Sequence, residues 1–362
     1  MTETIAIALS GGIDSLMTAA LLKDQGHKLF GIHFLTGFEK IEGKQPSKQL
    51  AADDFQRAES KTRRHLSPMM EQLDIPLHII DLRNEFKRQV VDYFVGAYRA
   101  GKTPNPCQKC NPSIKFGLLY EAAKRHGATR MATGHYARLK PAADGRMRLL
   151  RGVDPNKDQS YFLARLRQDQ LRRSLFPLGD YTKDQTRQMA RNRGFQPAAR
   201  QESQDICFIK TGTYGAFLKQ QTGFIAKPGP IVDLDGNHLG THNGLYLFTV
   251  GQRRGINCPS SEPYYVVRLD VAQNRLVVGR KADLAAQSFT AEGINWIIPK
   301  PASPIHIWVR VRYRHQAVPA TLTPIGKDGA EVRFDTSQPA VTPGQGAVFY
   351  QEDEVLGGGW IQ

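Results

Sequence analysis

Apolar runs alternate with amphipathic segments through the first half of the chain. Patterns typical of buried strands occur at residues 5–9, 29–35, 74–80 and 128–132. Apolar residues at helical spacing occur between and after them, at residues 16–22, 85–99, 114–126 and 183–193. Strands that alternate with helices predict a parallel, doubly wound α/β sheet. Ligands of such sheets bind at the carboxyl ends of the strands.

The pattern changes further along the chain. A hairpin is predicted at residues 138–151, around Asp144-Gly145, and the polar segment 157–162 is expected to lead into an apolar strand. After Cys207 the segments become short, and from residue 264 onward alternating runs predict an antiparallel β-barrel. We therefore expect three domains, at residues 1–207, 208–285 and 286–362, the last being the barrel.

The turn after the first predicted strand is rich in glycine. It reads Ser10-Gly11-Gly12-Ile13-Asp14-Ser15 and leads into an apolar helix. Paired glycines allow a tight turn and close approach to a ligand, and a helix N-terminus attracts anions. Asp14 could hold a Mg²⁺ ion that binds phosphate. An ordinary strand-to-helix turn would have the same pattern, so the turn alone does not decide the function.

Composition indicates a basic protein of several domains. The chain has 362 residues, enough for more than one domain. Its net charge of +15 could serve solubility alone, but a charge this large favours a polyanionic partner such as nucleic acid. The sequence contains neither an apolar run of about 18 residues nor a signal-peptide pattern. We therefore expect no membrane partner and a cytoplasmic location. The polar segment 37–72 suggests no function.

Cys107 and Cys110 form a CxxC, which we expect in an extended, proline-rich loop just before a helix. Three interpretations compete: a zinc site, a buried cysteine pair, and reactive sulfur chemistry. A helix N-terminus and nearby lysines would lower the thiol pKa values and favour reactive sulfur. Cys207 lies in a polar stretch with Gln204 and Asp205, which favours the same interpretation. Cys258 has no such neighbours and is predicted to be structural.

The glycine turn resembles the PP-loop, SGGxDS, of ATP pyrophosphatases, and we call residues 10–15 the PP-loop. Further motifs follow in a fixed order: TPNPCQKCN with IKFG, ATGHYAR, KDQSYFL, ESQDICFI, LYLFTVGQRRG, RVRYRH and TPGQGAVFY. Together they resemble the bacterial tRNA-specific 2-thiouridylase family over essentially the whole chain. Each motif alone is weak, but the ordered set is specific.

This resemblance implies a reaction and a set of site residues. The family uses ATP to adenylate the C2 oxygen of the wobble uridine, position 34, in tRNAs for Lys, Glu and Gln, and a cysteine persulfide supplies the sulfur. Cys207 matches the persulfide cysteine and Cys110 its partner thiol, with which it ends as a disulfide; Asp14 belongs to the catalytic set. The positions that match ATP contacts are Ala8, Leu9, Ser10, Gly11, Gly12, Ile13, Asp14, Ser15, Phe34 and Gly134. The positions that match the target-base loop are Asn105, Pro106 and Cys107, and those that match tRNA contacts are His135, Lys157, Asp158, Gln159, Arg312, Tyr313 and Gln345.

The implied cofactors are ATP and Mg²⁺, and the implied partners are tRNA and a sulfur-donor protein, either a desulfurase or a persulfide relay. Two positions depart from the family pattern: Leu16 stands where many PP-loops have a second serine that could donate to phosphate, and Cys107 stands where some members have Asp. Cys107, Cys110 and Cys207 could together hold an Fe–S cluster, as in related thiolases. Other PP-loop ligases and a tRNA-binding protein with a degraded site remain as alternatives.

Overall fold

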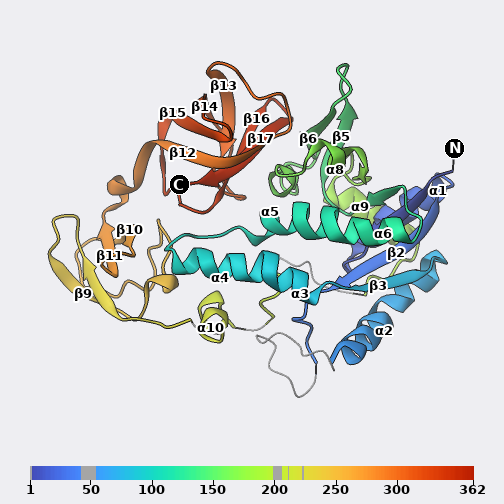
Figure 1. The fold of residues 1–362 in the computed structure, drawn as a ribbon, viewed down its shortest axis with the longest axis horizontal. Helices are drawn as coiled ribbons and strands as arrows, with labels where there is room; N and C mark the ends of the chain where they lie inside the picture. Colours follow the sequence, from blue (N-terminus) through green and yellow to red (C-terminus); the bar gives the residue numbers. More distant parts are fainter. Residues whose placement is uncertain (1, 42–53, 199–205, 211, 222–223) are drawn as a thin grey trace. The chain divides into compact units, whose positions relative to one another are not determined.

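The computed structural model describes residues 2–41, 54–198, 206–210, 212–221 and 224–362 (Figure 1). The chain forms two compact units. The first unit contains residues 1–90, 107–211 and 353–356, and the second contains 91–106, 212–352 and 357–362. Gln204, Asp205 and the stretch 42–53 lie outside the described residues.

A five-stranded parallel sheet forms the centre of the first unit and confirms the predicted doubly wound fold. Its strands follow the order β3-β2-β1-β4-β7. They are β1 (Thr4–Ala8), β2 (Lys28–Leu35), β3 (Leu77–Asp81), β4 (Arg130–Ala132) and β7 (Ser174–Leu175). The chain moves outward from β1 first through β2 and β3 and later through β4 and β7. The strand order therefore reverses between β1 and β4, where ligands of such sheets bind.

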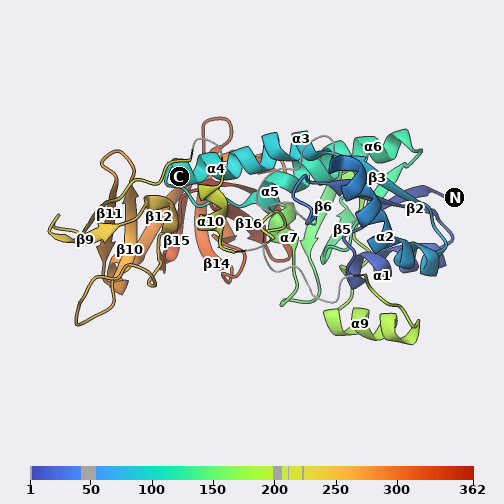
Figure 2. The same ribbon diagram turned by 90° about the horizontal axis from the view of Figure 1, so that it is seen from below.

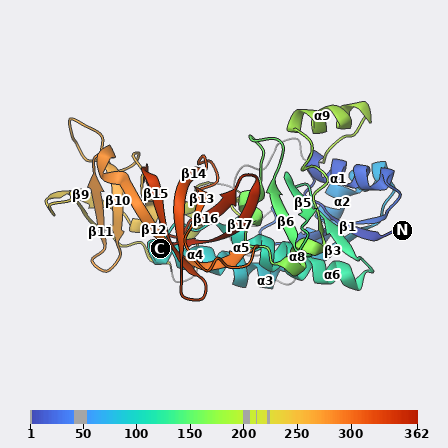
Figure 3. The ribbon, with the colours of Figure 1, turned by 90° about the horizontal axis from the view of Figure 1, so that it is seen from above.

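Helices cover both faces of this sheet. Figure 2 shows α1 (Ile13–Asp24), α2 (Phe55–Leu73) and α9 (Lys183–Asn192) on one face and α3 (Arg83–Phe86) and α6 (Tyr120–Arg125) on the other. Figure 3 shows the same separation from the opposite side. Side chains of β1, α1, α2 and α9 share one apolar core, which includes Ile7, Leu16, Met69 and Ala190.

Two of the predicted helices contain π-helical turns. The helix expected at 85–99 consists of α3, a π-helix η2 (Lys87–Val91) and α4 (Asp92–Arg99). The helix expected at 114–126 begins as a longer π-helix, η3 (Asn111–Leu119), and ends as α6. A Cβ on Gly117 would lie 2.8 Å from the Pro112 carbonyl oxygen, so glycine is required where the π-helix brings the backbone close.

The cysteine-containing segment is helical, and the prediction of an extended loop was wrong. Helix α5 (Pro106–Cys110) begins at a proline. Proline at the first helical position has a suitable φ and lacks only an N–H that would have no partner in the helix. Cys107 and Cys110 therefore lie on a helix that continues into η3.

The hairpin predicted at 138–151 is present as β5 (Ala137–Pro141) and β6 (Met147–Arg151), with Gly145 at φ +78° in its turn. The apolar strand expected after residue 157 is instead the short helix α7 (Ser160–Leu163). The carboxylate of Asp158 accepts hydrogen bonds from the backbone N and hydroxyl of Ser160 at 3.0 Å, which starts this helix. Helix α8 (Gln168–Arg172) follows.

The second unit contains a small central sheet with strand order β10-β11-β8-β9. Its strands are β8 (Gly229–Val232), β9 (His238–His242), β10 (Tyr265–Asp270) and β11 (Arg275–Gly279), and helix α10 (Tyr214–Lys219) precedes them. Two short 3₁₀ helices, η4 (Leu245–Leu247) and η5 (Lys281–Leu284), lie between and after them. The alternating runs near residues 265 and 277 thus belong to this sheet rather than to the barrel.

The predicted antiparallel β-barrel is confirmed in the C-terminal part. Its strands are β12 (Ala285–Trp296), β13 (Ile305–Arg310), β14 (Val318–Ile325), β15 (Gly329–Pro339), β16 (Gly346–Gln351) and β17 (Glu354–Ile361). Pairing of Ala291 with Ile361 joins β12 to β17 and closes the barrel. Among the described residues, no helix is both long enough and apolar enough to cross a membrane.

Strand β13 contains only the first residue of the RVRYRH motif. The strand ends at Arg310. The guanidinium of Arg310 donates to the carbonyl oxygens of Tyr313 and His315, which turns the chain back on itself. Only Arg310 therefore belongs to the strand.

Candidate active site

The PP-loop lies at the carboxyl end of β1, beside the point where the strand order reverses. Helix α1 begins at Ile13, and its N-cap residue Gly12 provides no side-chain hydrogen bond. The first N–H groups of a helix have no partners within the helix. Ser15 Oγ donates to the Gly12 carbonyl at 2.9 Å and accepts from the Ser10 N–H at 3.4 Å, which closes the turn. The arrangement is an uncapped helix N-terminus suited to an anion.

The backbone conformation of this turn requires glycine. Gly11 has φ +82°, and a Cβ there would also lie 3.4 Å from His65 Nε2. The Leu9 N–H donates to Ile32 at 2.9 Å, and the Leu9 carbonyl lies 2.8 Å from His33 Nδ1, so both of its backbone groups support the loop. Ala8 is the last residue of β1.

Leu16, which stands where many PP-loops have a second serine, packs into the core of the first unit. Its side chain is fully buried, so this position offers no side-chain donor to a phosphate.

Gly134 and Phe34 lie at the carboxyl ends of the neighbouring strands. A Cβ on Gly134 would come within 2.9 Å of the backbone carbon of Asp14, so only glycine lets the β4 end pack on the PP-loop. Phe34 lies near the end of β2, and its ring centroid is 6.2 Å from that of Phe86. Both residues therefore lie at the carboxyl edge of the sheet, where the PP-loop also lies.

Asp14 has two partners that the sequence did not reveal. Its Oδ1 accepts from the Tyr136 hydroxyl and from Lys183 Nζ, each at 2.8 Å. Its Oδ2 accepts from the same ammonium at 2.8 Å. Lys183 is the first residue of α9 and its side chain is 4% exposed, whereas that of Asp14 is 29% exposed. Lys183 is 169 residues from Asp14 in the sequence, so no local pattern could have linked them.

The Asp14 side chain suits a Mg²⁺ site in which the protein contributes one ligand. Mg²⁺ in nucleotide sites usually takes one or two carboxylates, with waters and substrate phosphates completing its shell. The carboxylate is partly exposed at the PP-loop, but it shares both oxygens with Lys183. A metal ion at this position would compete with the ammonium.

The helix that contains Cys107 and Cys110 is fixed by amide side chains. Gln108 donates to the Tyr161 carbonyl at 2.8 Å, and Asn111 donates to the Phe162 carbonyl at 2.9 Å. Both amides are buried. Cys110 therefore occupies a position set by contacts to α7.

Cys207 is held by an aromatic neighbour. Phe208 is fully buried, and its ring centroid lies 5.8 Å from that of Phe86 and 6.0 Å from that of Phe38. This aromatic cluster includes residues from the loop after β2 and from α3. It anchors the Cys207 segment to the part of the unit that contains Phe34.

Cys207 lies near enough to Cys107 and Cys110 to raise their pKa values, and all four cysteines are free. Burial raises the pKa of Cys107 to about 11, and the nearby Cys207 thiol adds to this effect. Burial also raises the pKa values of Cys110 and Cys207, and the Lys115 ammonium opposes the rise at all three thiols. The side chains of Cys107 and Cys207 reach the surface, yet the protein packed around the thiols raises their pKa values rather than lowering them as expected. At Cys207 the ammonium groups of Lys210 and Lys115 oppose this rise without reversing it. Lys115, within the IKFG motif, is one of the nearby lysines that the sequence suggested would act on these thiols.

This electrostatic setting predicts a pH dependence. Only the thiolate is nucleophilic, so a raised pKa means that the Cys207 thiolate fraction grows about tenfold per pH unit across neutral and mildly alkaline pH. Alkylation of Cys207 by iodoacetamide, followed by peptide mass spectrometry, should accelerate from pH 7 to 8.5 without a plateau. Lys115→Met should slow alkylation at each pH, and the control Lys109→Met should not. A plateau near pH 7 would contradict a raised pKa.

His135 and the segment 157–159 lie beside β4 and the hairpin. His135 Nδ1 lies 2.7 Å from Thr133 Oγ1, and burial holds its pKa well below the usual value, so this imidazole is neutral at pH 7. Gln159 Oε1 accepts from the Tyr136 N–H at 3.0 Å. Asp158 is 4% exposed, and its carboxylate accepts hydrogen bonds from the backbone N–H groups of Gly152 and Ser160.

The remaining predicted tRNA contacts belong to the second unit. Gln345 Nε2 donates to the carbonyl of Thr103 at 3.0 Å and thus holds the chain just before Asn105 and Pro106. Asn105 is 8% exposed. Arg312 is exposed in the turn after β13, and Tyr313 beside it is half-buried.

The described part of the chain shows no ready-made site for a single metal ion. Across the described residues, which include Cys107, Cys110 and Cys207, no group of three or more His, Cys, Asp or Glu is close enough to hold a metal ion. We therefore derive no chemical step through a cluster.

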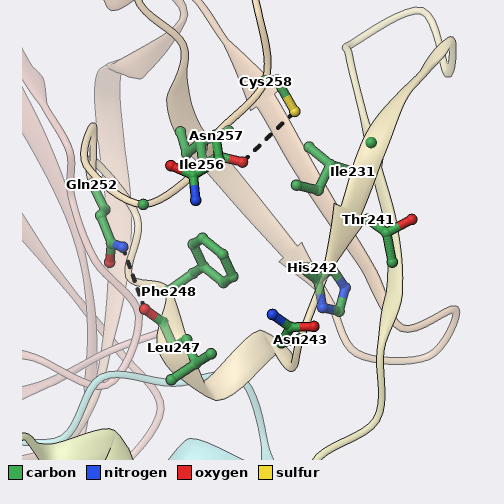
Figure 4. Close-up of a pocket in the computed structure, with 12 residues that line it drawn as sticks. Ile231, Thr241, His242, Asn243, Leu247, Phe248, Gln252, Ile256, Asn257 and Cys258 are labelled. Carbon is green, nitrogen blue, oxygen red and sulfur yellow. Dashed lines mark hydrogen bonds between the residues drawn. The ribbon is translucent and has the colours of Figure 1, made fainter.

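A separate cavity of about 330 Å³ lies in the second unit and contains none of the predicted site residues (Figure 4). Its lining includes His242, Gln252 and Cys258. The Cys258 thiol donates to the Ile256 carbonyl at 3.7 Å, and Gln252 Nε2 donates to the Leu247 carbonyl at 3.3 Å. These polar groups bond to their own segment, which agrees with a structural role for Cys258.

Comparison with known proteins decides the family. The tRNA methyl transferase HUP domain model matches residues 3–211, the tRNA methyl transferase PRC-barrel domain model 215–280, and the aminomethyltransferase beta-barrel domain model 286–361. The tRNA-specific 2-thiouridylase MnmA of Desulfosudis oleivorans is 48% identical over 99% of this chain and 94% of that protein. The chain belongs to the tRNA-specific 2-thiouridylase family. The MnmA of Geotalea uraniireducens is 44% identical over 99% of this chain and 95% of its own length.

Membership of the 2-thiouridylase family confirms the resemblance found in the sequence and implies ATP use and a tRNA substrate. Among solved structures, the U34-tRNA thiolase NcsA from Methanococcus maripaludis with its [4Fe-4S] cluster is 19% identical. The likeness covers 60% of this chain and 62% of that one, with a TM-score of 0.33. A likeness this distant has no bearing on the chemistry of this chain.

Proposed function

We propose that this 2-thiouridylase replaces the C2 oxygen of wobble uridine 34 with sulfur in tRNAs for Lys, Glu and Gln. The observation that carries the proposal is that one unit contains both an uncapped helix N-terminus at the PP-loop and three free thiols, with Cys207 near enough to Cys107 and Cys110 to raise their pKa values. The first feature suits polyphosphate and the second suits sulfur transfer. Membership of the family supports their combination in one reaction.

The first step is adenylation. The C2 oxygen attacks the α-phosphorus of ATP, the bond to the β-phosphate oxygen breaks, and pyrophosphate leaves. The free N–H groups at the start of α1 receive the negative charge of the phosphates. The proposed nucleotide contacts are those of the PP-loop with Ala8, Leu9, Phe34 and Gly134, and Asp14 would act as a ligand for Mg²⁺, which supplies charge neutralisation at the phosphates.

The second step is sulfur transfer from Cys207. The terminal sulfur of a Cys207 persulfide attacks C2, and AMP leaves with the former C2 oxygen. Cys110 then attacks the Cys207 sulfur, which breaks the S–S bond, leaves the thiocarbonyl on the base and forms a Cys110–Cys207 disulfide that an external thiol reduces. This step requires the two Cα atoms to approach within about 4.4–6.8 Å in one state, a distance that stays a prediction.

The proposal extends to substrate binding and context. Asn105, Pro106 and Cys107 would contact the target base, and His135, Lys157, Asp158, Gln159, Arg312, Tyr313 and Gln345 would contact the rest of the tRNA. A desulfurase or persulfide relay would load sulfur onto Cys207, and the enzyme would act in the cytoplasm with its tRNA.

We also propose the domain division 1–207, 208–285 and 286–362, which the matched family ranges support.

Nucleoside mass spectrometry tests this function. Unmodified tRNA(Lys) transcript, the full chain, Mg-ATP and a persulfide donor should yield 2-thiouridine at position 34, together with AMP and pyrophosphate. A transcript with cytidine at position 34 is the control and should yield none. Thiolation that proceeds without ATP, or none with every component present, would refute the proposal.

A further inference from the structure

A buried ammonium group lies next to the PP-loop and takes no part in the reaction steps above. Lys183 Nζ donates to both carboxylate oxygens of Asp14 at 2.8 Å, and its side chain is 4% exposed. The ammonium also lies 5.8 Å from the centroid of the Tyr136 ring, whose hydroxyl donates to the same carboxylate. Lysine is rarely buried to this extent unless it is paired.

The backbone at Lys183 is fixed independently of this ion pair. Its N–H donates to Asp154 Oδ2 at 2.9 Å. Thr182 and Gln185 form a capping box, with hydrogen bonds of 3.2 Å and 2.8 Å, that defines the start of α9. The side chain therefore extends from a rigid helix end to a PP-loop residue that lies in the first turn of α1.

Folding stability alone does not account for this arrangement. A buried ion pair is often no more stabilising than apolar residues of the same volume, because desolvation offsets the attraction. An apolar pair would, however, leave the PP-loop without the Asp14 carboxylate. Without Lys183, that carboxylate would repel the polyphosphate for which the helix N-terminus is suited.

We infer that Lys183 is a positioning residue of the adenylation site, which orients the Asp14 carboxylate and cancels its charge so that the PP-loop accepts a polyphosphate anion. This inference rests on the proposed function, because it takes the PP-loop to be the ATP site. Lys183 acts through Asp14, so its importance depends on whether the carboxylate is present. A lysine with only a structural role would show this dependence in stability but would leave the ATP affinity of each folded variant unchanged.

ATP binding by a set of variants tests the inference. Equilibrium binding of ATP to the full chain, measured in EDTA so that no divalent cation bridges Asp14 to the phosphates, should weaken about 10- to 100-fold in Lys183→Met, the range expected when one close charge interaction is lost. The double variant Asp14→Asn/Lys183→Met contains neither charge and should bind ATP more tightly than Lys183→Met. Lys23→Met, which removes a half-exposed ammonium paired with Asp74 in the same unit, should bind as the wild type does.

A second readout is divalent-cation binding without nucleotide. Mn²⁺, followed by electron paramagnetic resonance, should bind Lys183→Met more tightly than the wild type, because the Asp14 carboxylate no longer has a competing ammonium. Thermal unfolding would show whether each variant is folded. If Lys183→Met does not fold, the comparison moves to Asp14→Asn against the double variant, which should be the more stable because no buried ammonium is left unpaired.

The outcomes separate this inference from the proposed function. If the wild type binds ATP but Lys183→Met binds it equally well, or the double variant binds no better than Lys183→Met, Lys183 is not a positioning residue. If the wild type itself binds no ATP, the proposed function fails. Weaker ATP binding in Lys183→Met with recovery in the double variant supports the inference.

Discussion

Cys207→Ser is expected to lower 2-thiouridine formation to background while the adenylation half-reaction continues. Serine cannot form a persulfide, so no sulfur reaches C2. The PP-loop is built from β1 and α1, whereas Cys207 lies in a segment held by Phe208. Pyrophosphate should therefore still be released when tRNA and ATP are supplied.

Cys110→Ser should stop the reaction one step later. The terminal sulfur of the Cys207 persulfide can still attack C2, but no thiolate then cleaves the resulting S–S bond. The variant should accumulate a covalent enzyme–tRNA adduct that dithiothreitol releases as 2-thiouridine tRNA. Denaturing electrophoresis with and without reductant measures this adduct.

Cys258→Ser is the matched control for both cysteine variants. Cys258 lies in the second unit, where its thiol bonds to the Ile256 carbonyl, and it should not affect thiolation. Full activity in Cys207→Ser would exclude Cys207 as the sulfur carrier. Loss of activity in Cys258→Ser with the fold intact would show that the sulfur path differs from the one proposed.

Asp14→Asn should reduce tRNA-dependent pyrophosphate release by at least about a hundredfold, the scale on which a single electrostatic group in an active site acts. The amide has no negative charge for a divalent cation and accepts fewer hydrogen bonds. The Lys183 ammonium would then remain buried without its counter-ion. Because the Asp14 side chain is 29% exposed, we expect a loss of about 1–3 kcal/mol in the free energy of unfolding, less than for a fully buried pair.

A pyrophosphate-release assay and urea unfolding measure the two effects of Asp14→Asn. Asp24→Asn is the control, because Asp24 lies on the same helix and pairs with Arg193 away from the PP-loop. Asp24→Asn should retain pyrophosphate release. Near-normal release in Asp14→Asn would remove Asp14 from the catalytic set.

The sequence predicted the elements that depend on local patterns. The doubly wound fold of the first unit follows from apolar segments that alternate with amphipathic ones, and Gly11 at φ +82° follows from the paired glycines of the PP-loop. The helix predicted at 183–193 and the hairpin predicted at 138–151 also rest on residues near one another in the chain. Local sequence preferences of this kind predict the folded structure correctly where the tertiary contacts favour the same conformation.

Features that depend on distant contacts were not predicted. The two prolines before Cys107 suggested an extended loop, yet Pro106 starts a helix that Gln108 fixes to Tyr161, a residue 53 positions away. The thiol pKa values are raised by burial, which only the folded chain creates. Lys183 pairs with Asp14 across 169 positions. In each case the deciding partner lies far away in the sequence.

An oxygen-tracing experiment tests the central claim most directly. The tRNA transcript would contain oxygen-18 at C2 of uridine 34, and the AMP released during thiolation would be examined by mass spectrometry. The account predicts that AMP acquires the heavy oxygen in its phosphate, in a one-to-one ratio with 2-thiouridine formed. AMP that contains no heavy oxygen, while 2-thiouridine still forms, would show that C2 is not activated by adenylation and would contradict the account.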